Sequence, residues 1–283
     1  MRGAKGKLIC IWSPVIHGEG CSTLACGVGI GLQYFSDKKV LIVNVGNSAN
    51  HMERYLEGDI EIKYSMDNLR IFNNEIRTEH ILTYATQINK DLYIIAGSRL
   101  NREVTGDNKG FDNIFIEKCL AGFDIVIADL DIGVSSENRL YLERADIILP
   151  VATPNEIVMD ELFDNRGAQE TLDYFSDEKA VNIINKLWDG WETAGVTGRY
   201  KNRYSLSYVF GLNYNGDVIN ACCTDKNFYS FLMKEIKRDK SIFVKQLNEI
   251  CTFLIERLYG EKSTVGAIKQ RNFFRKFLRS SIY

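Results

Sequence analysis

A short apolar run followed by a glycine-containing loop constrains this chain more than any other feature. Residues 7–12 (KLICIW) are mostly apolar, which predicts a buried parallel strand. The loop 13–23 (SPVIHGEGCST) follows, and residues 24–35, rich in Ala, Leu, Gly and Ile, predict a buried helix. A second apolar run at 39–46 completes a βαβ unit. Such a loop can hold phosphate, because its N–H groups point inward and the helix N-terminus is partially positive.

The loop departs from the nucleotide-binding pattern G-x-x-x-x-G-K-[ST], most clearly at the lysine. If Gly20 is its last glycine, Ser22 is the hydroxyl that would bind Mg²⁺, and Cys21 stands where the lysine belongs. A thiol cannot supply the cation that this lysine brings to the terminal phosphates. The pattern therefore indicates where a nucleotide would bind, and the missing lysine predicts weaker binding.

The order of strand, Ser-Pro, glycine loop, Ser-Thr-Leu-Ala and helix, followed by Lys-Lys-Val-Leu-Ile-Val, resembles the MinD/ParA group of P-loop ATPases. These proteins carry the deviant loop motif K-G-G-x-G-K-[ST]. The resemblance covers roughly residues 7–260 and continues in the segments 91–98, 123–129, 145–154 and 183–186. It implies an α/β fold with a mostly parallel central sheet and helices on both faces. A narrower similarity, to pilus-assembly proteins of the TadZ/CpaE type, rests on the irregular loop.

The resemblance also implies ATP and Mg²⁺ as cofactors and assigns the residues that would bind them. The predicted nucleotide-binding residues are Gly18, Glu19, Gly20, Cys21, Ser22, Thr23 and, as a base contact, Asn185. The predicted Mg²⁺ ligands are Ser22 and Asp129. Two alternatives stay open: Asn185 as an ordinary loop asparagine, and Asp129 as a loop cap with Asp131 standing in for a missing acid.

The departures from the family concern the residues of hydrolysis. The family's first lysine falls at Ile16, the loop lysine at Cys21, and the D-x-D after the second strand at Asn44-Val45-Gly46. Phosphoryl transfer depends on positioning and on cations that neutralise developing charge. We therefore assign no catalytic residue and expect a very slow ATPase or a pseudo-ATPase. Cations supplied from elsewhere, such as Lys5, Lys7 or a partner subunit, would restore activity.

The remaining apolar periodicity predicts further elements. We expect a long helix at 156–174, strands at 180–184 and 204–211, and closing helices at 228–237 and 241–259. Trp188 and Trp191 would stack on a base, contact a partner or pack in the interior.

Composition excludes several classes of protein. A net charge of −2 gives no overall attraction to nucleic acid, so specific nucleic-acid binding is not indicated. No apolar run approaches the ~18 residues that span a bilayer. The seven cysteines form no C-x-x-C pair, which predicts buried reduced thiols. We expect one cytoplasmic P-loop NTPase-like domain at 1–260, followed by a linker and a basic amphipathic helix at 261–283.

The C-terminal helix is predicted at 268–279 (IKQRNFFRKFLR). Its aromatic and leucine side chains gather on one helical face and its basic side chains on the other. This pattern is typical of a segment that lies on an anionic membrane, and it resembles the tail of MinD in position and composition. We expect peripheral attachment to the inner face of the plasma membrane. Docking on the body or on a partner protein is the alternative.

Three functional hypotheses remain. The first is a MinD/ParA-like positioning or assembly protein that uses ATP as a dimerising ligand with weak or no hydrolysis. It would be a homodimer recruited to membrane or partner by its C-terminal helix. The second is an active ATPase with cations from elsewhere, and the third is a scaffold of a pilus, secretion or conjugation system that binds no nucleotide.

Overall fold

The computed structural model of the 283-residue chain describes residues 5–14, 18–45, 52–99, 109–164, 169–176, 178–188 and 192–260. The predicted C-terminal helix at 268–279 lies outside the described residues, as do Ile16, Gly46 and Trp191.

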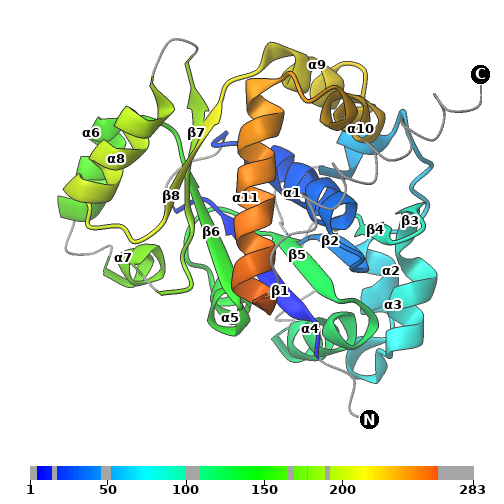
Figure 1. Cartoon of the computed structure of the whole chain (residues 1–283). Helices are drawn as coiled ribbons and strands as arrows, with labels where there is room; N and C mark the ends of the chain where they lie inside the picture. The colour runs from blue at the N-terminus through cyan, green and yellow to red at the C-terminus, as the bar shows by residue number, and fades with distance from the viewer. Residues whose placement is uncertain are drawn as a thin grey trace, which may run out of the picture.

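Eight strands of the described residues form one sheet at the centre of the molecule (Figure 1). The strands are β1 (Lys7–Trp12), β2 (Val40–Asn44), β3 (Thr86–Asn89), β4 (Leu92–Ile95), β5 (Ile125–Asp129), β6 (Ile147–Ala152), β7 (Asn182–Leu187) and β8 (Val209–Asn213). Their spatial order is β3-β4-β2-β5-β1-β6-β7-β8. Every neighbouring pair is parallel except the β3–β4 pair at one edge. The predicted α/β fold with a mostly parallel sheet is confirmed.

Helices cover both faces of this sheet (Figure 1). The longer ones are α1 (Cys21–Phe35), α4 (Lys109–Gly122), α5 (Ser136–Arg144), α6 (Glu156–Asp164), α7 (Gln169–Ser176), α8 (Thr193–Arg203), α9 (Gly216–Cys223), α10 (Phe228–Arg238) and α11 (Ile242–Tyr259). The shorter ones are α2 (Met66–Arg70), α3 (Thr78–Tyr84) and two 3-10 turns, η1 (Met52–Leu56) and η2 (Asn73–Glu75).

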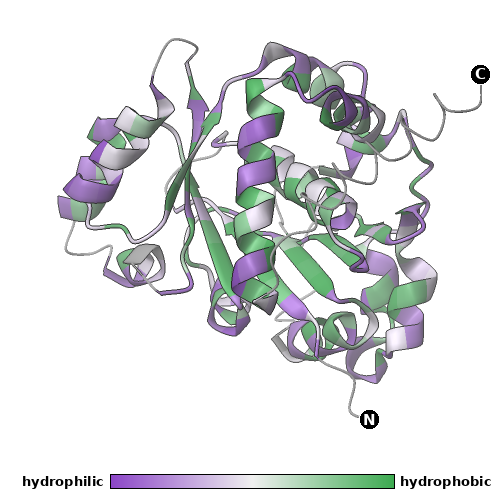
Figure 2. Ribbon diagram, in the orientation of Figure 1, coloured by the Kyte–Doolittle hydropathy of each residue, from purple (hydrophilic) through white to green (hydrophobic). Residues whose placement is uncertain are grey.

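Two separate apolar layers explain why the strands are almost wholly hydrophobic. Ile9 and Ile11 of β1 face the layer that contains α1, α10 and α11, whereas Leu8 and Cys10 face the layer that contains α4, α5 and α8. Successive side chains of a strand point to opposite faces, so a strand covered on both sides needs apolar residues at every position. Figure 2 shows the resulting continuous hydrophobic strands in green, surrounded by helices of mixed polarity.

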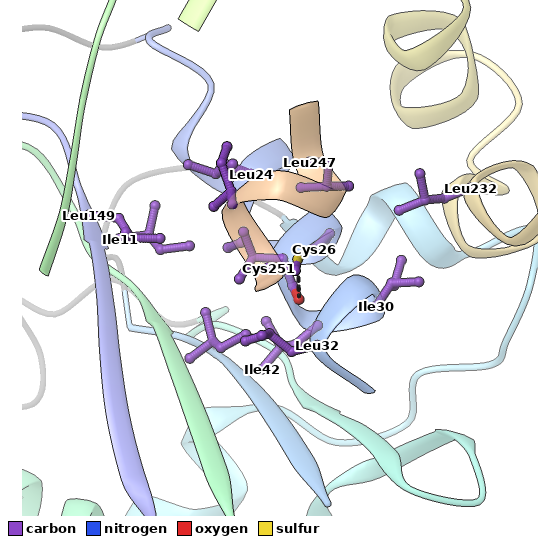
Figure 3. Packing of buried hydrophobic residues seen from close by; sticks show 14 of the residues in the cluster. Ile11, Leu24, Cys26, Ile30, Leu32, Ile42, Leu149, Leu232, Leu247 and Cys251 are labelled. Atoms are coloured by element: carbon purple, nitrogen blue, oxygen red, sulfur yellow. Dashed lines mark hydrogen bonds between the residues drawn. The ribbon is translucent and has the colours of Figure 1, made fainter. Parts of the chain in front are cut away.

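Helix α1 fits between the sheet and α11 because glycines remove side chains on both of its sides. A Cβ at Gly29 would lie 2.5 Å from Ile42 Cδ1 of β2, and one at Gly31 would lie 2.6 Å from the Cys251 sulfur of α11. Figure 3 shows this layer, in which the Cys251 thiol donates a hydrogen bond to the Val28 carbonyl at 3.9 Å. The close packing places the start of α1, and hence the loop before it, next to the strand ends.

Three sequence predictions need correction. The helix predicted at 156–174 is two helices, α6 and α7. The strand predicted at 204–211 begins only at Val209, because Tyr204 ends α8, stacks on Phe163 and donates a hydrogen bond from its hydroxyl to Asp160 at 2.8 Å. The strand predicted at 180–184 runs from Asn182 to Leu187, so it reaches farther toward the loop.

The cysteines are free thiols, and five of the seven are buried, as the sequence predicts. None of the described helices combines the length and the hydropathy that crossing a bilayer requires.

Replacing Gly29 by valine tests the close approach of α1 to the sheet. The added methyl groups would overlap Ile42, and we expect a loss of about 2 kcal/mol in the free energy of unfolding, measured by urea denaturation. Gly198→Val in α8 is the matched control, because a Cβ there would contact nothing within 4 Å; we expect a change below about 0.5 kcal/mol. Equal effects of the two substitutions would contradict this account of α1.

Candidate functional site

Several polar side chains lie together at one edge of the sheet, where the carboxyl ends of β1, β2, β5 and β7 meet. Asn44, the last residue of β2, pairs in register with Asp129, the last residue of β5. The loop after β1 lies beside them, and the chain order reverses around β1, which is flanked by β5 and β6. Open α/β sheets bind ligands at the carboxyl ends of their strands, where the strand order reverses. This edge is therefore the candidate site.

The loop before α1 is built on two glycines with left-handed backbone. Gly18 has φ +91° and Gly20 has φ +94°. Gly20 precedes the first turn of α1, and a Cβ there would overlap the side-chain amide of Asn185. The first N–H groups of a helix lack acceptors within the helix, and the helix dipole adds partial positive charge. No side chain caps this helix start. The arrangement fits an anion at the start of α1.

Two side chains from the end of β7 bind the carbonyl groups of this loop. The Asn185 amide donates to the Glu19 carbonyl at 2.7 Å, and the Lys186 ammonium donates to the Gly18 carbonyl. The Asn185 Oδ1 accepts a hydrogen bond from the Lys186 N–H at 2.9 Å. Asn185 is thus more than an ordinary loop asparagine, because it holds the loop; the base contact that the family resemblance implies stays a prediction.

Ser22 and Asp129 meet at the start of α1, and their predicted role as Mg²⁺ ligands stays a prediction. The Ser22 hydroxyl donates to Asp129 Oδ2 at 2.6 Å, while Asp129 Oδ1 is buried and has no hydrogen-bond partner among the described residues. Burial raises the pKa of Asp129 to about 7; the Ser22 hydrogen bond opposes this, and the charges of Asp131 and Glu53 add to it. A buried carboxylate oxygen beside a hydroxyl is a suitable pair of ligands for Mg²⁺, which prefers oxygen.

The described residues hold no group of three or more His, Cys, Asp or Glu side chains arranged for a metal ion. Ser22 and Asp129 would therefore supply only two ligands. Mg²⁺ usually keeps several waters and binds through one or two protein oxygens together with phosphate. The pair fits a cation that arrives with a nucleotide.

Cys21 does not replace the missing lysine. Its thiol is half-buried, and burial raises its pKa well above the ordinary value, with the charges of Asp129 and Glu19 raising it further. The thiol is therefore neutral at physiological pH. Glu19 is buried beside it, accepts a hydrogen bond from Thr153 at 3.3 Å, and has a pKa raised by burial. Thr23 hydrogen-bonds to Cys222 of α9.

Two further residues, Lys186 and Glu53, lie at this edge and were not predicted from the sequence. Lys186 follows Asn185 directly, so its position at the strand end was a usable signal. Glu53 of η1 is buried and accepts a hydrogen bond from the Asn44 amide at 3.1 Å, at the strand end to which the family resemblance assigns a D-x-D. It lies in a polar stretch without periodicity, and nothing in the sequence distinguishes it.

Lys5 and Lys7 cannot serve as cations for this loop. Lys7 begins β1 and forms an ion pair with Asp146 at 2.9 Å, whereas the loop follows the other end of the same strand. A strand of six residues spans about 20 Å, beyond the reach of a lysine side chain. That part of the second hypothesis is wrong.

Trp188 is 62% exposed and stacks on Tyr214, which excludes interior packing for it.

The raised pKa of Asp129 predicts how stability depends on pH. Between about pH 4 and pH 7 the native state keeps a proton that the unfolded chain has released, so this residue makes stability fall as the pH rises through that range. We expect Asp129→Asn to reduce this fall and to raise stability at pH 8 by about 1 kcal/mol or more. Thermal unfolding of both proteins from pH 4 to pH 8 measures it. Parallel curves would contradict a buried, titrating Asp129.

Comparisons with known proteins agree with this architecture. No family model matches the chain. The septum site-determining protein MinD of Thermotoga maritima is 23% identical over 211 residues, which cover 73% of this chain and 75% of that protein.

Solved structures show the same fold. A ParA family ATPase from Chlorobium tepidum superposes with a TM-score of 0.69 at 14% identity, over 87% of this chain and 98% of that one. The MinD of Pyrococcus horikoshii, solved in complex with Mg-ADP, superposes with a TM-score of 0.66 at 12% identity, over 88% and 96% of the two chains. The predicted resemblance to the MinD/ParA-type P-loop ATPases is confirmed for the fold, and the narrower similarity to TadZ/CpaE-type proteins stays a prediction.

Proposed function

We propose that this MinD/ParA-like chain is a positioning or assembly protein that binds ATP with Mg²⁺ at the loop from Gly18 to Thr23. ATP would act as a ligand that joins two copies, with little or no hydrolysis. The observation that carries the proposal is the Ser22–Asp129 pair, with its unpartnered buried oxygen, directly after two left-handed glycines at the start of a helix. Nucleotide binding by the Pyrococcus horikoshii relative supports it.

Each group of the site would have its own role in binding ATP with Mg²⁺. The N–H groups at the start of α1 would bind phosphate oxygens, and Ser22 and Asp129 would hold Mg²⁺, which supplies charge neutralisation to the phosphates when bound. Cys21 brings no positive charge, and Asn44-Val45-Gly46 brings no carboxylate to the place of the family's D-x-D. Positioning and charge neutralisation are what phosphoryl transfer needs, so weak hydrolysis follows from their loss.

A scaffold that binds no nucleotide is the second candidate, and one observation favours it. The loop carries a neutral thiol between two carboxyl groups, Glu19 and Asp129, and this arrangement disfavours a polyanion. The two candidates make opposite predictions for nucleotide binding.

Titration of the full chain with a fluorescent ATP analogue, with and without Mg²⁺, separates the two candidates. We expect saturable binding that depends on Mg²⁺ and is lost in Gly20→Val, because the valine would overlap Asn185 in a left-handed backbone. Gly198→Val serves as the control and should bind as the unmodified protein does. No binding at millimolar nucleotide would leave the scaffold as the function.

The C-terminal segment gives the proposal its second part. We propose that residues 268–279 recruit the body to an anionic membrane or to a partner of a positioning or assembly machinery. Five basic side chains and an aromatic face within twelve residues supply the required chemistry.

Vesicle co-sedimentation tests recruitment. The full chain should bind vesicles that contain anionic lipid, release them as the salt concentration rises, and lose binding on removal of residues 267–283. Vesicles of neutral lipid are the control. Equal binding of the truncated chain would exclude this segment as the anchor, and absence of binding by the full chain would leave a partner protein as its target.

A further inference from the structure

Lys186 brings a positive charge to the loop that lacks its own lysine. Its side chain leaves the end of β7 and donates a hydrogen bond to the Gly18 carbonyl. It also lowers the pKa of Glu19 and Cys21 against the stronger effect of burial. Since Cys21 occupies the position of the P-loop lysine, Lys186 adds positive charge to a loop that lacks its own, from the side of the loop's carbonyl groups.

We propose that Lys186 is the cation of this nucleotide loop and, together with Asn185, the residue that orients the loop's peptide groups toward phosphate. The charge role of Lys186 rests on the proposed nucleotide binding. The orienting role of Lys186 and Asn185 does not, because it concerns the protein without any ligand.

The orienting role follows from the geometry of the peptide bond. In a trans peptide the C=O and N–H groups point in opposite directions. The Gly18 carbonyl points to Lys186, so the Glu19 N–H points away from β7; the Glu19 carbonyl points to Asn185, so the Gly20 N–H does the same. The two side chains of β7 thereby fix two successive N–H groups on the opposite side of the loop, as a phosphate-binding loop requires.

The backbone of Lys186 supports a functional role. Its φ of +58° lies in the left-handed region, where a residue other than glycine costs roughly 1 kcal/mol. The register between β7 and β8 shifts between Ile184 and Leu187, around this residue. A glycine would satisfy this backbone at lower cost, but it could not reach the Gly18 carbonyl. A strained backbone that directs a side chain into a site is typical of functional positions.

Lys226 offers a matched control. It is also a lysine with a left-handed backbone, φ +53°, and its ammonium group is also paired, with Glu57 at 2.7 Å. It lies between α9 and α10, outside the loop and its β7 contacts. Substitutions at Lys186 and Lys226 therefore change the same residue type in the same backbone conformation, and only one of them affects the loop.

Hydrogen–deuterium exchange of the nucleotide-free full chain tests the orienting role. Lys186→Met removes the donor and keeps the length of the side chain, and we expect faster exchange of the peptide that covers residues 18–24. Lys226→Met should leave that peptide unchanged. Unchanged exchange in Lys186→Met would overturn the orienting role, whether or not the protein binds nucleotide.

Binding of the fluorescent ATP analogue and of inorganic tripolyphosphate tests the charge role. We expect Lys186→Met to weaken both about tenfold, and to reduce the salt dependence of binding, because one positive charge near the phosphates is lost. Lys186→Gly should show the same loss together with equal or higher thermal stability, which separates the effect on binding from misfolding. The added substitution Cys21→Lys should restore affinity to Lys186→Met, since it returns the charge to its position in the P-loop pattern.

The outcomes distinguish the two proposals. If the unmodified protein binds nucleotide and Lys186→Met binds equally well, the charge role is overturned and the proposed function stands. If the unmodified protein binds neither probe, the proposed function and the charge role both fail, and exchange alone decides the orienting role.

Discussion

The close packing of α1 between the sheet and α11 is the constraint on which the site depends. Glycines at positions 29 and 31 leave room for Ile42 on one side and Cys251 on the other. Bulkier residues would push the helix away from β2 and β5, and its first turn would lose the Ser22–Asp129 hydrogen bond. These glycines lower the intrinsic helix propensity of α1, but they allow it to pack closely against the sheet and α11. Packing therefore decides both the helix and the site.

Electrostatics at the edge of the sheet is unusual for a site that would bind a polyanion. Asp129, Glu53 and Glu19 are buried close to the loop, and the Cys21 thiol is neutral. Mg²⁺ at Asp129 and the ammonium of Lys186 would each offset part of this negative charge. If the proposed nucleotide site is correct, its affinity would depend on a divalent cation and on Lys186 of β7.

Much of the fold was predictable from the sequence, because buried parallel strands are long apolar runs and the loop of residues 18–23 joins a strand to a helix. Ser22 and Asp129 were predictable for the same reason, since each follows or ends such a run. The position of Lys186 beside Asn185 pointed to the same strand end, but its contact with Gly18 could not be predicted, because the two residues are distant in sequence. Lys5 and Lys7 were wrong candidates because proximity in sequence to the loop conceals the length of the strand between them.

Helix α11 runs from the edge of the sheet that carries the loop to the opposite edge, and the chain leaves the described body at that opposite edge. Near its beginning, Gln246 accepts a hydrogen bond from the Asn213 N–H, at the edge that carries the loop. At its end, the Tyr259 hydroxyl donates to the Asp124 carbonyl, just before β5 begins. The whole helix, 18 residues from Ile242 to Tyr259, is about 27 Å long, and its part from Gln246 to Tyr259 covers about 20 Å. The chain therefore leaves the described body at the end of the sheet opposite the candidate site, so a tether attached there would start about one helix length away from that site.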